Sequence, residues 1–298
     1  MTDTGWLWIV FTVLAAAGQT VRNAMQRELT ATLGTTGATH VRFLFGFPFA
    51  LIFLFGLMLV TGAPLPHPPA IFWAWIIDGM GAQIIATALM LAAMGERSFV
   101  VTIAYIKTEP VQVALFGLIF LGDTLSVSMV AAILIATAGV VMMSLKPGAR
   151  SESWRPTWLG LASGAMFALS AVGYRGAILS LNLSDFMMAA TFTLVMGLLL
   201  QSVILSAYLM LRSPDVMRAI LQAWRPSLFA GFMGATASQF WYLAFALATA
   251  ASVRTVALVE VLFAQAIASF VFHQKTSARE SIGIVLIVLG VAALIWAH

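Results

Sequence analysis

Cysteine is absent from this sequence, and charged residues are scarce. Asp, Glu, Lys and Arg together make up 9% of the 298 residues, whereas a soluble domain carries about 25%. The absence of cysteine excludes a disulfide framework and the thiolate chemistry of redox and zinc-binding proteins. The scarcity of charge argues against a soluble domain of any fold class.

Residues that carry chemistry in enzymes are also few. The four histidines lack the spacing of metal ligands, and no glycine-rich phosphate loop precedes a lysine. We therefore expect no enzyme, no cofactor and no metal, and an integral membrane enzyme is the weaker alternative. The net charge of +4 comes without the basic runs that bind nucleic acid, so no nucleic-acid partner is expected. The histidines are His40, His67, His273 and His298, and His40 is expected at the membrane interface beside Arg42.

Long apolar runs are what the sequence has in abundance. Apolar residues make up 61% of the chain, and the mean hydropathy is +1.00. A helix of about 20 apolar residues crosses the hydrocarbon core of a bilayer, and continuous apolar runs indicate helices, since the strands of a β-barrel alternate in polarity. We predict an all-α integral membrane protein with ten transmembrane helices. The expected spans are 6–24, 39–60, 71–90, 99–121, 126–145, 158–179, 186–211, 228–248, 253–272 and 282–297.

A polar segment at residues 146–156, KPGARSESWRP, divides the chain almost in half. It predicts two five-helix repeats, 1–148 and 149–298. Displacing the sequence by 151 residues places Glu109 on Glu260 and Gly139 on Gly290, which favours a duplication. An odd number of spans in each repeat turns the second repeat upside down in the membrane. Inverted repeats of this kind are typical of secondary transporters.

The distribution of basic residues gives an expectation for orientation, because Lys and Arg favour the cytoplasmic side. Twelve of them lie in or beside the odd-numbered loops of the predicted spans, and Arg175 alone leans toward an even-numbered loop. This distribution predicts periplasmic termini. The twelve are Arg22, Arg27, Arg42, Arg97, Lys146, Arg150, Arg155, Arg212, Arg218, Arg225, Lys275 and Arg279.

Short blocks of the sequence resemble the drug/metabolite transporter superfamily in its ten-span form with two EamA-type halves. They are THVRFLFG at 39–46, KTEPV at 107–111, LGDTL at 121–125 and AGVV at 138–141, and the second half repeats them loosely. The resemblance covers nearly the whole chain. It implies a transporter of the bacterial inner membrane, similar to exporters of amino acids, aromatic ones among them. It also implies cytoplasmic termini, opposite to the distribution of basic residues.

Ionisable residues inside predicted spans need an explanation, because each costs about 2.5–3.5 kcal/mol at a helix centre. Lys107 and Glu109 lie in span 99–121, and Arg254 and Glu260 lie in span 253–272. A separation of two places Lys107 and Glu109 on different helix faces, which favours pairing between helices. One interpretation is a midplane substrate site, in which the two glutamates bind a proton or an ammonium and the cations bind a carboxylate. The other is a set of structural ion pairs, with Arg254 reaching an interface.

The remaining candidates surround these charges in the predicted spans. Pro110 removes a helical hydrogen bond beside Glu109 and is a candidate hinge, or a static kink. The amides Gln83 and Gln239 are candidates to hydrogen-bond a substrate. Three aromatic residues are candidates for a wall of the cavity, namely Tyr105, Trp241 and Tyr242. Asp78 is a candidate to face an aqueous vestibule or to cap a broken helix.

The predicted function is export of amino acids, with aromatic or apolar ones preferred, or of related small metabolites. Alternating access between the two inverted repeats is the expected mechanism, and a passive facilitator or channel is the alternative. The expected partners are the small-molecule substrate, membrane lipid and protons. Glycine strips such as Gly160-x-x-x-Gly164 are assigned to packing within a monomer.

Overall fold

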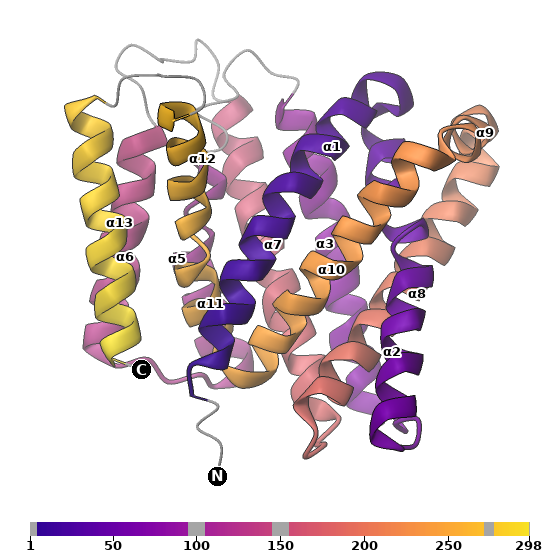
Figure 1. Cartoon of the computed structure of the whole chain (residues 1–298), viewed down its shortest axis with the longest axis horizontal. Helices are drawn as coiled ribbons and strands as arrows, with labels where there is room; N and C mark the ends of the chain where they lie inside the picture. Colours follow the sequence, from indigo (N-terminus) through magenta and orange to yellow (C-terminus); the bar gives the residue numbers. More distant parts are fainter. Residues whose placement is uncertain (1–4, 95–104, 145–154, 271–276, 298) are drawn as a thin grey trace.

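The computed structural model describes residues 5–94, 105–144, 155–270 and 277–297, and within these ranges no strand is present. The elements are helical throughout (Figure 1). They are α1 (Leu7–Leu44), α2 (Phe47–Thr61), α3 (Ala70–Met94), α5 (Glu109–Phe116), the π-helix η1 (Gly117–Leu121), α6 (Val127–Ser144), α7 (Arg155–Ser180), α8 (Phe186–Arg212), α9 (Pro214–Gln222), α10 (Trp224–Leu247), α11 (Ala250–Val256), α12 (Val259–Phe270) and α13 (Ala278–Ala297).

The described helices include four segments long and apolar enough to cross a membrane, and two shorter apolar ones. Apolar side chains are exposed on their outer faces, for example Leu59 (86%), Val127 (88%) and Leu211 (83%). Soluble proteins rarely expose large apolar surfaces, so these faces suit lipid. The chain is an all-α membrane protein, and the expected number of ten spans stays a prediction. The four longer segments are Glu28–Thr61, Ala70–Ala93, Phe186–Arg212 and Ala278–Ala297.

The first helix does not end where the sequence predicted. A loop was expected between residues 24 and 39, but α1 continues to Leu44 and breaks only at Gly34, where φ is 67° and ψ is 176°. Glycine adopts this left-handed φ without the steric cost that other residues meet. α2 follows after Gly46, with proline in its first turn. The longer helix carries Arg22 and Arg42 inside the bundle.

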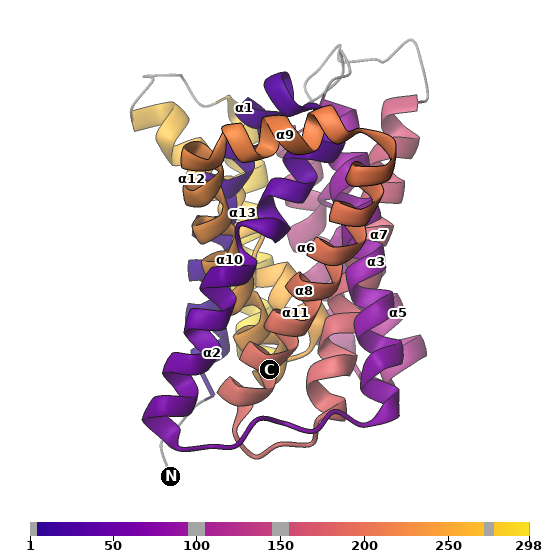
Figure 2. The ribbon, with the colours of Figure 1, turned by 90° about the vertical axis from the view of Figure 1, so that its right-hand side faces the viewer.

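Helices from the two halves of the sequence pack closely against one another. The start of α1 and the end of α13 lie at the same end of the bundle (Figure 1), and α9 lies across the opposite end (Figures 1 and 2). The core therefore forms between the two halves. The pairs between the halves include α1 with α10, α2 with α8, α3 with α7, α5 with α7, α5 with α11 and α6 with α13.

Glycines let α6 and α13 approach closely. A Cβ atom on Gly290 would lie 2.6 Å from the backbone nitrogen of Ala136, and one on Gly139 would lie 2.7 Å from the carbonyl oxygen of Gly283. Separations this short leave no room for a side chain. The glycines of the predicted tenth span thus serve packing within the chain.

We expect Gly290→Ala to destabilise the protein by about 1–3 kcal/mol, because the added methyl group overpacks the contact between α6 and α13. The matched control is Gly56→Ala in α2, where an added Cβ meets nothing within 4 Å. The control should be neutral or gain up to about 1 kcal/mol of helix stability. Thermal denaturation in detergent, followed by circular dichroism, compares the two. Equal melting temperatures would contradict the close packing.

Candidate functional site

Two predicted spans are interrupted, the fourth near its middle and the ninth near its start. A turn at residues 107–108 precedes α5, and a turn at 257–258 separates α11 from α12. In both turns the backbone bonds over three residues, from Thr108 N–H to Tyr105 O and from Leu258 N–H to Thr255 O, each 3.1 Å. Such tightened turns within helices often mark hinges. The interruptions face each other, because α5 packs against α11 (Figure 1).

Four charged side chains pair across the two interruptions. Lys107 Nζ forms an ion pair with Glu260 Oε1, and Arg254 Nε lies 3.0 Å from Glu109 Oε1. The latter two atoms make no aligned hydrogen bond, so their contact is Coulombic. Each pair joins the fourth predicted span to the ninth, as expected for pairing between helices. Both glutamates also lie in the first turn of a helix, whose partial positive charge favours a carboxylate.

Gln19 of α1 and Trp241 of α10 complete the surroundings of these charges. Gln19 Nε2 donates to Glu260 Oε2 (3.4 Å), and the Trp241 indole N–H donates to Gln19 Oε1 (3.2 Å). The Arg254 guanidinium carbon lies 4.3 Å from the centroid of the Trp241 ring, a cation–π contact. A small cavity lies among these groups, lined by Gln19, Lys107, Glu109, Pro110, Arg254, Ala257, Leu258 and Glu260.

Two more small cavities adjoin the first, since all three share Gln19 and Arg254 as lining residues. We call the three together the central site. The second is lined by Gln19, Arg22, Asn23, Met90, Ile106, Lys107, Glu109, Phe167 and Arg254. The third is lined by Gln19, Arg22, Arg42, Gln83, Phe167, Tyr174, Ser238, Trp241, Tyr242, Phe245 and Arg254.

A buried polar network holds one wall of the central site. The Tyr174 hydroxyl donates to Gln83 Oε1 (2.9 Å), and Gln201 Nε2 donates to Gln83 Oε1 (3.1 Å) and to the Tyr174 oxygen (3.0 Å). The Tyr174 and Tyr242 rings lie 4.7 Å apart between centroids. Satisfied networks of this kind rigidify a core. The network therefore fixes the position of the two tyrosines.

Most of the predicted site residues meet in the central site, and three do not. Asp78 is exposed on α3, with Oδ2 against Gly173 of α7. Gln239 Nε2 donates to Thr191 Oγ1 of α8 (2.8 Å). Each residue of a helix is rotated by about 100° from the one before it. Asp78 and Gln239 therefore lie on other faces of α3 and α10 than Gln83 and Trp241, which line the central site. Tyr105 is also absent from the lining. The predicted residues that are present are Lys107, Glu109, Pro110, Arg254, Glu260, Gln83, Trp241 and Tyr242.

The sequence predicted that Pro110 kinks the middle of a continuous helix, and the structure does not bear this out. Pro110 lies in the first turn of α5, where the missing N–H interrupts no helical hydrogen bond. The interruption comes before it, at residues 107–108. The equivalent turn at 257–258 forms without any proline. The candidate hinge is therefore the turn itself.

Sequence reasoning missed Arg22 and Arg42, which it assigned to loop ends. Both line the central site, with only 2% and 3% of their surfaces exposed. His40, expected at an interface, is fully buried, and its Nε2 lies 3.0 Å from the Ser206 hydroxyl of α8. A signal that could have found Arg22 is the helix-forming run that follows it, AMQRE at 24–28, which continues the helix past it. For Arg42 the signal is the apolar run that follows it directly.

A second cluster of contacts, the terminal clamp, ties α7 to the loop after η1 and to the end of α10. Arg175 Nη2 lies 3.5 Å from Asp123 Oδ1, and Arg175 Nη1 donates to Phe245 O (2.6 Å) and to Ala248 O. These carbonyls belong to the last turn of a helix, which leaves acceptors free. That end of α10 lies at the same end of the bundle as the start of α1 (Figure 1).

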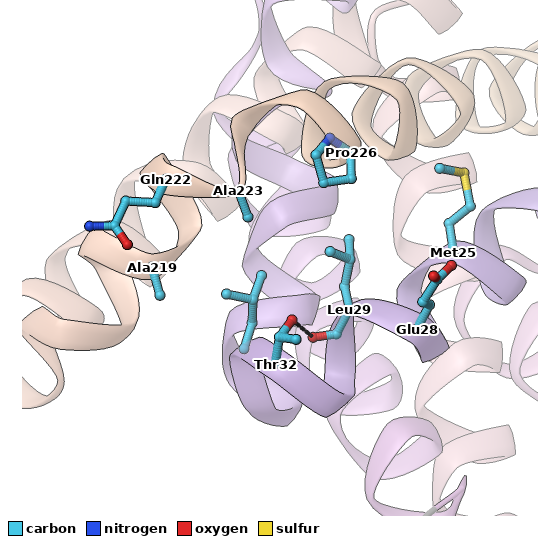
Figure 3. Close-up of a pocket in the computed structure, with 9 residues that line it drawn as sticks. Met25, Glu28, Leu29, Thr32, Ala219, Gln222, Ala223 and Pro226 are labelled. Atoms are coloured by element: carbon cyan, nitrogen blue, oxygen red, sulfur yellow. Dashed lines mark hydrogen bonds between the residues drawn. The ribbon is translucent and has the colours of Figure 1, made fainter.

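A larger cavity of about 520 Å³ lies between α1 and the corner formed by α9 and α10 (Figure 3). Its lining is mostly apolar, and Glu28 is its one ionisable residue. Converging polar groups mark a specific binding site, and this cavity lacks them. The lining residues are Met25, Glu28, Leu29, Thr32, Leu33, Ala219, Gln222, Ala223 and Pro226.

No family model matches the sequence, and no curated protein matches it. A solved structure described only as "Crystal structure of protein" is similar, with a TM-score of 0.68 and 15% sequence identity. The match covers 96% of this chain and 98% of that one. At this identity the likeness shows the fold alone. The helical arrangement is thus shared over nearly the full length of both chains.

Proposed function

We propose that this chain is a secondary transporter of the bacterial inner membrane that exports amino acids or related small metabolites by alternating access. In this proposal the chain spans the membrane ten times as two inverted five-helix repeats. The observation that carries it is the central site, where two interrupted helices exchange ion pairs. Interrupted helices that meet at a charged site are the recurrent architecture of such carriers.

The helix pairs support the duplication. If the repeats are exchanged, α1 with α10 becomes α7 with α3, and both pairs are present. The pairs α2 with α8 and α6 with α13 each map onto themselves. A pseudo-two-fold arrangement is expected to have this property. The central site contains Glu109 of α5 and Glu260 of α12, the two glutamates that the displacement by 151 residues superposes.

The ion pairs suit a carrier because they can exchange partners. A substrate ammonium can replace Lys107 or Arg254 beside a carboxylate, and a substrate carboxylate can replace a glutamate beside a cation. Each replacement breaks a link between the fourth and ninth predicted spans. Substrate binding is thus coupled to the contact between the two repeats, which alternating access requires.

We expect Glu109→Gln and Glu260→Gln each to reduce transport at least about tenfold while the protein still inserts and folds, since a lost charge-assisted contact costs roughly 1.5–3 kcal/mol. The assay is counterflow of labelled phenylalanine and leucine in proteoliposomes, with and without a proton gradient. Asp215→Asn is the control, because Asp215 is exposed on α9. Wild-type flux in both glutamine variants would contradict the assignment. Flux that only follows the substrate gradient would favour a passive facilitator.

A further inference from the structure

We infer that Arg22 and Arg42 form an anion-binding subsite in the central site. The substrate class it selects is a small metabolite whose carboxylate or phosphate is not balanced by an ammonium group. This inference rests on the proposed function, because it names the substrate of the same site. It goes further by assigning the recognition of charge to two residues outside the ion pairs.

The first observation is that the two guanidinium groups are buried with neutral partners. Arg22 Nε and Nη2 donate to Asn23 Oδ1 at 3.3 and 2.8 Å. Arg42 Nη1 and Nη2 contact the Thr87 and Ser238 hydroxyls, both at the long distance of 3.5 Å, and Arg42 Nε has no hydrogen-bond partner. A buried charge is costly unless an opposite charge compensates it.

The second observation is the balance of charge around the three cavities. Among the described residues that line them, Arg22, Arg42, Lys107 and Arg254 are cationic and Glu109 and Glu260 are anionic. Lys107 and Arg254 already compensate the two glutamates. The surplus of positive charge therefore belongs to the arginine pair. An anionic ligand supplies the missing counter-charge, whereas a zwitterion leaves the surplus in place.

The third observation is that the two arginines are held side by side on one small residue. A Cβ atom on Gly234 of α10 would lie 3.2 Å from Arg42 Cγ and 3.6 Å from Arg22 Cδ. Both head groups line cavities that include aromatic side chains, with Trp241 and Tyr242 among them. Paired guanidinium groups present several planar donors to one carboxylate or phosphate. The aromatic wall then suits a planar body attached to that anion.

A size-matched series of probes isolates the effect of charge. Phenylpyruvate, phenylalanine and phenethylamine share an aromatic ring and differ in net charge from −1 to 0 to +1. We expect phenylpyruvate to bind the wild-type protein about tenfold or more tightly than phenylalanine, and phenethylamine to bind least. Ligand-induced thermal stabilisation in detergent reports binding, and counterflow in proteoliposomes reports transport.

Variants then assign the preference to the arginine pair. Arg22→Met and Arg42→Met should each remove the preference for phenylpyruvate and weaken phenylpyruvate binding more than phenylalanine binding, because the methionine keeps an apolar stem and loses the charge and the N–H donors. Arg22→Lys and Arg42→Lys should keep part of it. Arg218→Met is the matched control, since Arg218 is an exposed cation on α9.

The outcomes separate this inference from the proposed function. If the wild-type protein transports phenylalanine and shows no preference for phenylpyruvate, the anion subsite is wrong and the transporter stands. If it binds phenylpyruvate preferentially and carries neither compound, the subsite stands and the transporter is wrong. The wild-type comparison decides the first case even if the methionine variants do not fold. Unchanged preference in folded methionine variants would also overturn the inference.

Discussion

Reversing the charge of Lys107 alone, as Lys107→Glu, is expected to abolish transport and to destabilise the protein by about 3–5 kcal/mol or more. The change places two carboxylates together where an ion pair now links the fourth and ninth predicted spans. The reciprocal change Glu260→Lys should cost as much, because it brings two cations together. Charge reversal at a buried pair is severe since it places two like charges together away from water.

The double variant, Lys107→Glu with Glu260→Lys, should recover most of the lost stability. The recovered ion pair has the same length and the opposite polarity. A double-mutant cycle on melting temperature measures the coupling, and we expect about 3 kcal/mol or more. Transport should return only in part, because the substrate would meet the charges in reversed positions.

The exposed pair on α9 is the control for this cycle. Arg218 Nη1 lies 3.2 Å from Asp215 Oδ1, with side chains 75% and 92% exposed. Exchanging these two charges should show little or no coupling, because water and salt screen surface pairs. Coupling at the buried pair no larger than at this surface pair would show that Lys107 and Glu260 are not partners.

The sequence predicted the charged core of the site for a simple physical reason. A charge inside a 20-residue apolar run is costly, so Lys107, Glu109, Arg254 and Glu260 stand out without any structure. Helical periodicity then excluded pairing of neighbours within one span. Which cation faces which glutamate depends on the packing of α5 against α11, and the sequence contains no local signal for it.

Arg22 and Arg42 show where that reasoning fails. Both arginines lie near the ends of their predicted spans, 6–24 and 39–60, so they were counted with the adjoining loop. The helix continues past them, and its break at Gly34 depends on a backbone conformation that an isolated glycine does not announce. The turn at 257–258 was equally hidden, since no glycine or proline marks it. Tertiary packing decides such positions.

Asp78 and Gln239 lie outside the central site for a related reason. Each lies in a helix that lines the central site, and a polar residue in such a helix looks like a site residue. The side of the helix on which it lies depends on rotation about the axis, which a uniformly apolar span does not define. When the predicted rotation of a helix is slightly wrong, a residue that contacts a neighbouring helix is taken for one that lines the site.

We expect Arg175→Met to open the end of the bundle that the terminal clamp closes. The variant removes the ion pair with Asp123 and the donors to Phe245 O and Ala248 O. Breaking a largely buried pair destabilises the closed state by up to about 3–5 kcal/mol. A state in which these helices have already separated has no such pair to lose, so its free energy does not change. The population therefore shifts toward the state open at this end. A shift of only about 1.4 kcal/mol changes the open population tenfold.

The absence of cysteine allows this shift to be measured directly. Ala257→Cys places one small thiol in the lining of the central site without any background labelling. A membrane-impermeant maleimide is added from one side at a time, in right-side-out and inside-out vesicles. In Arg175→Met the labelling rate should rise about tenfold or more from one side only. Because the clamp lies at the same end as the start of α1, that side is also the side on which α1 begins.

Two further variants test whether the clamp acts through its charges. Asp123→Asn should raise the labelling rate less than Arg175→Met, since it leaves the two carbonyl acceptors bonded. Arg218→Met, far from the clamp on α9, should leave the rate unchanged. Equal rates from both sides in Arg175→Met would indicate general loosening of the bundle. An unchanged rate from both sides would show that Arg175 fixes the helices locally and does not close the path to the central site.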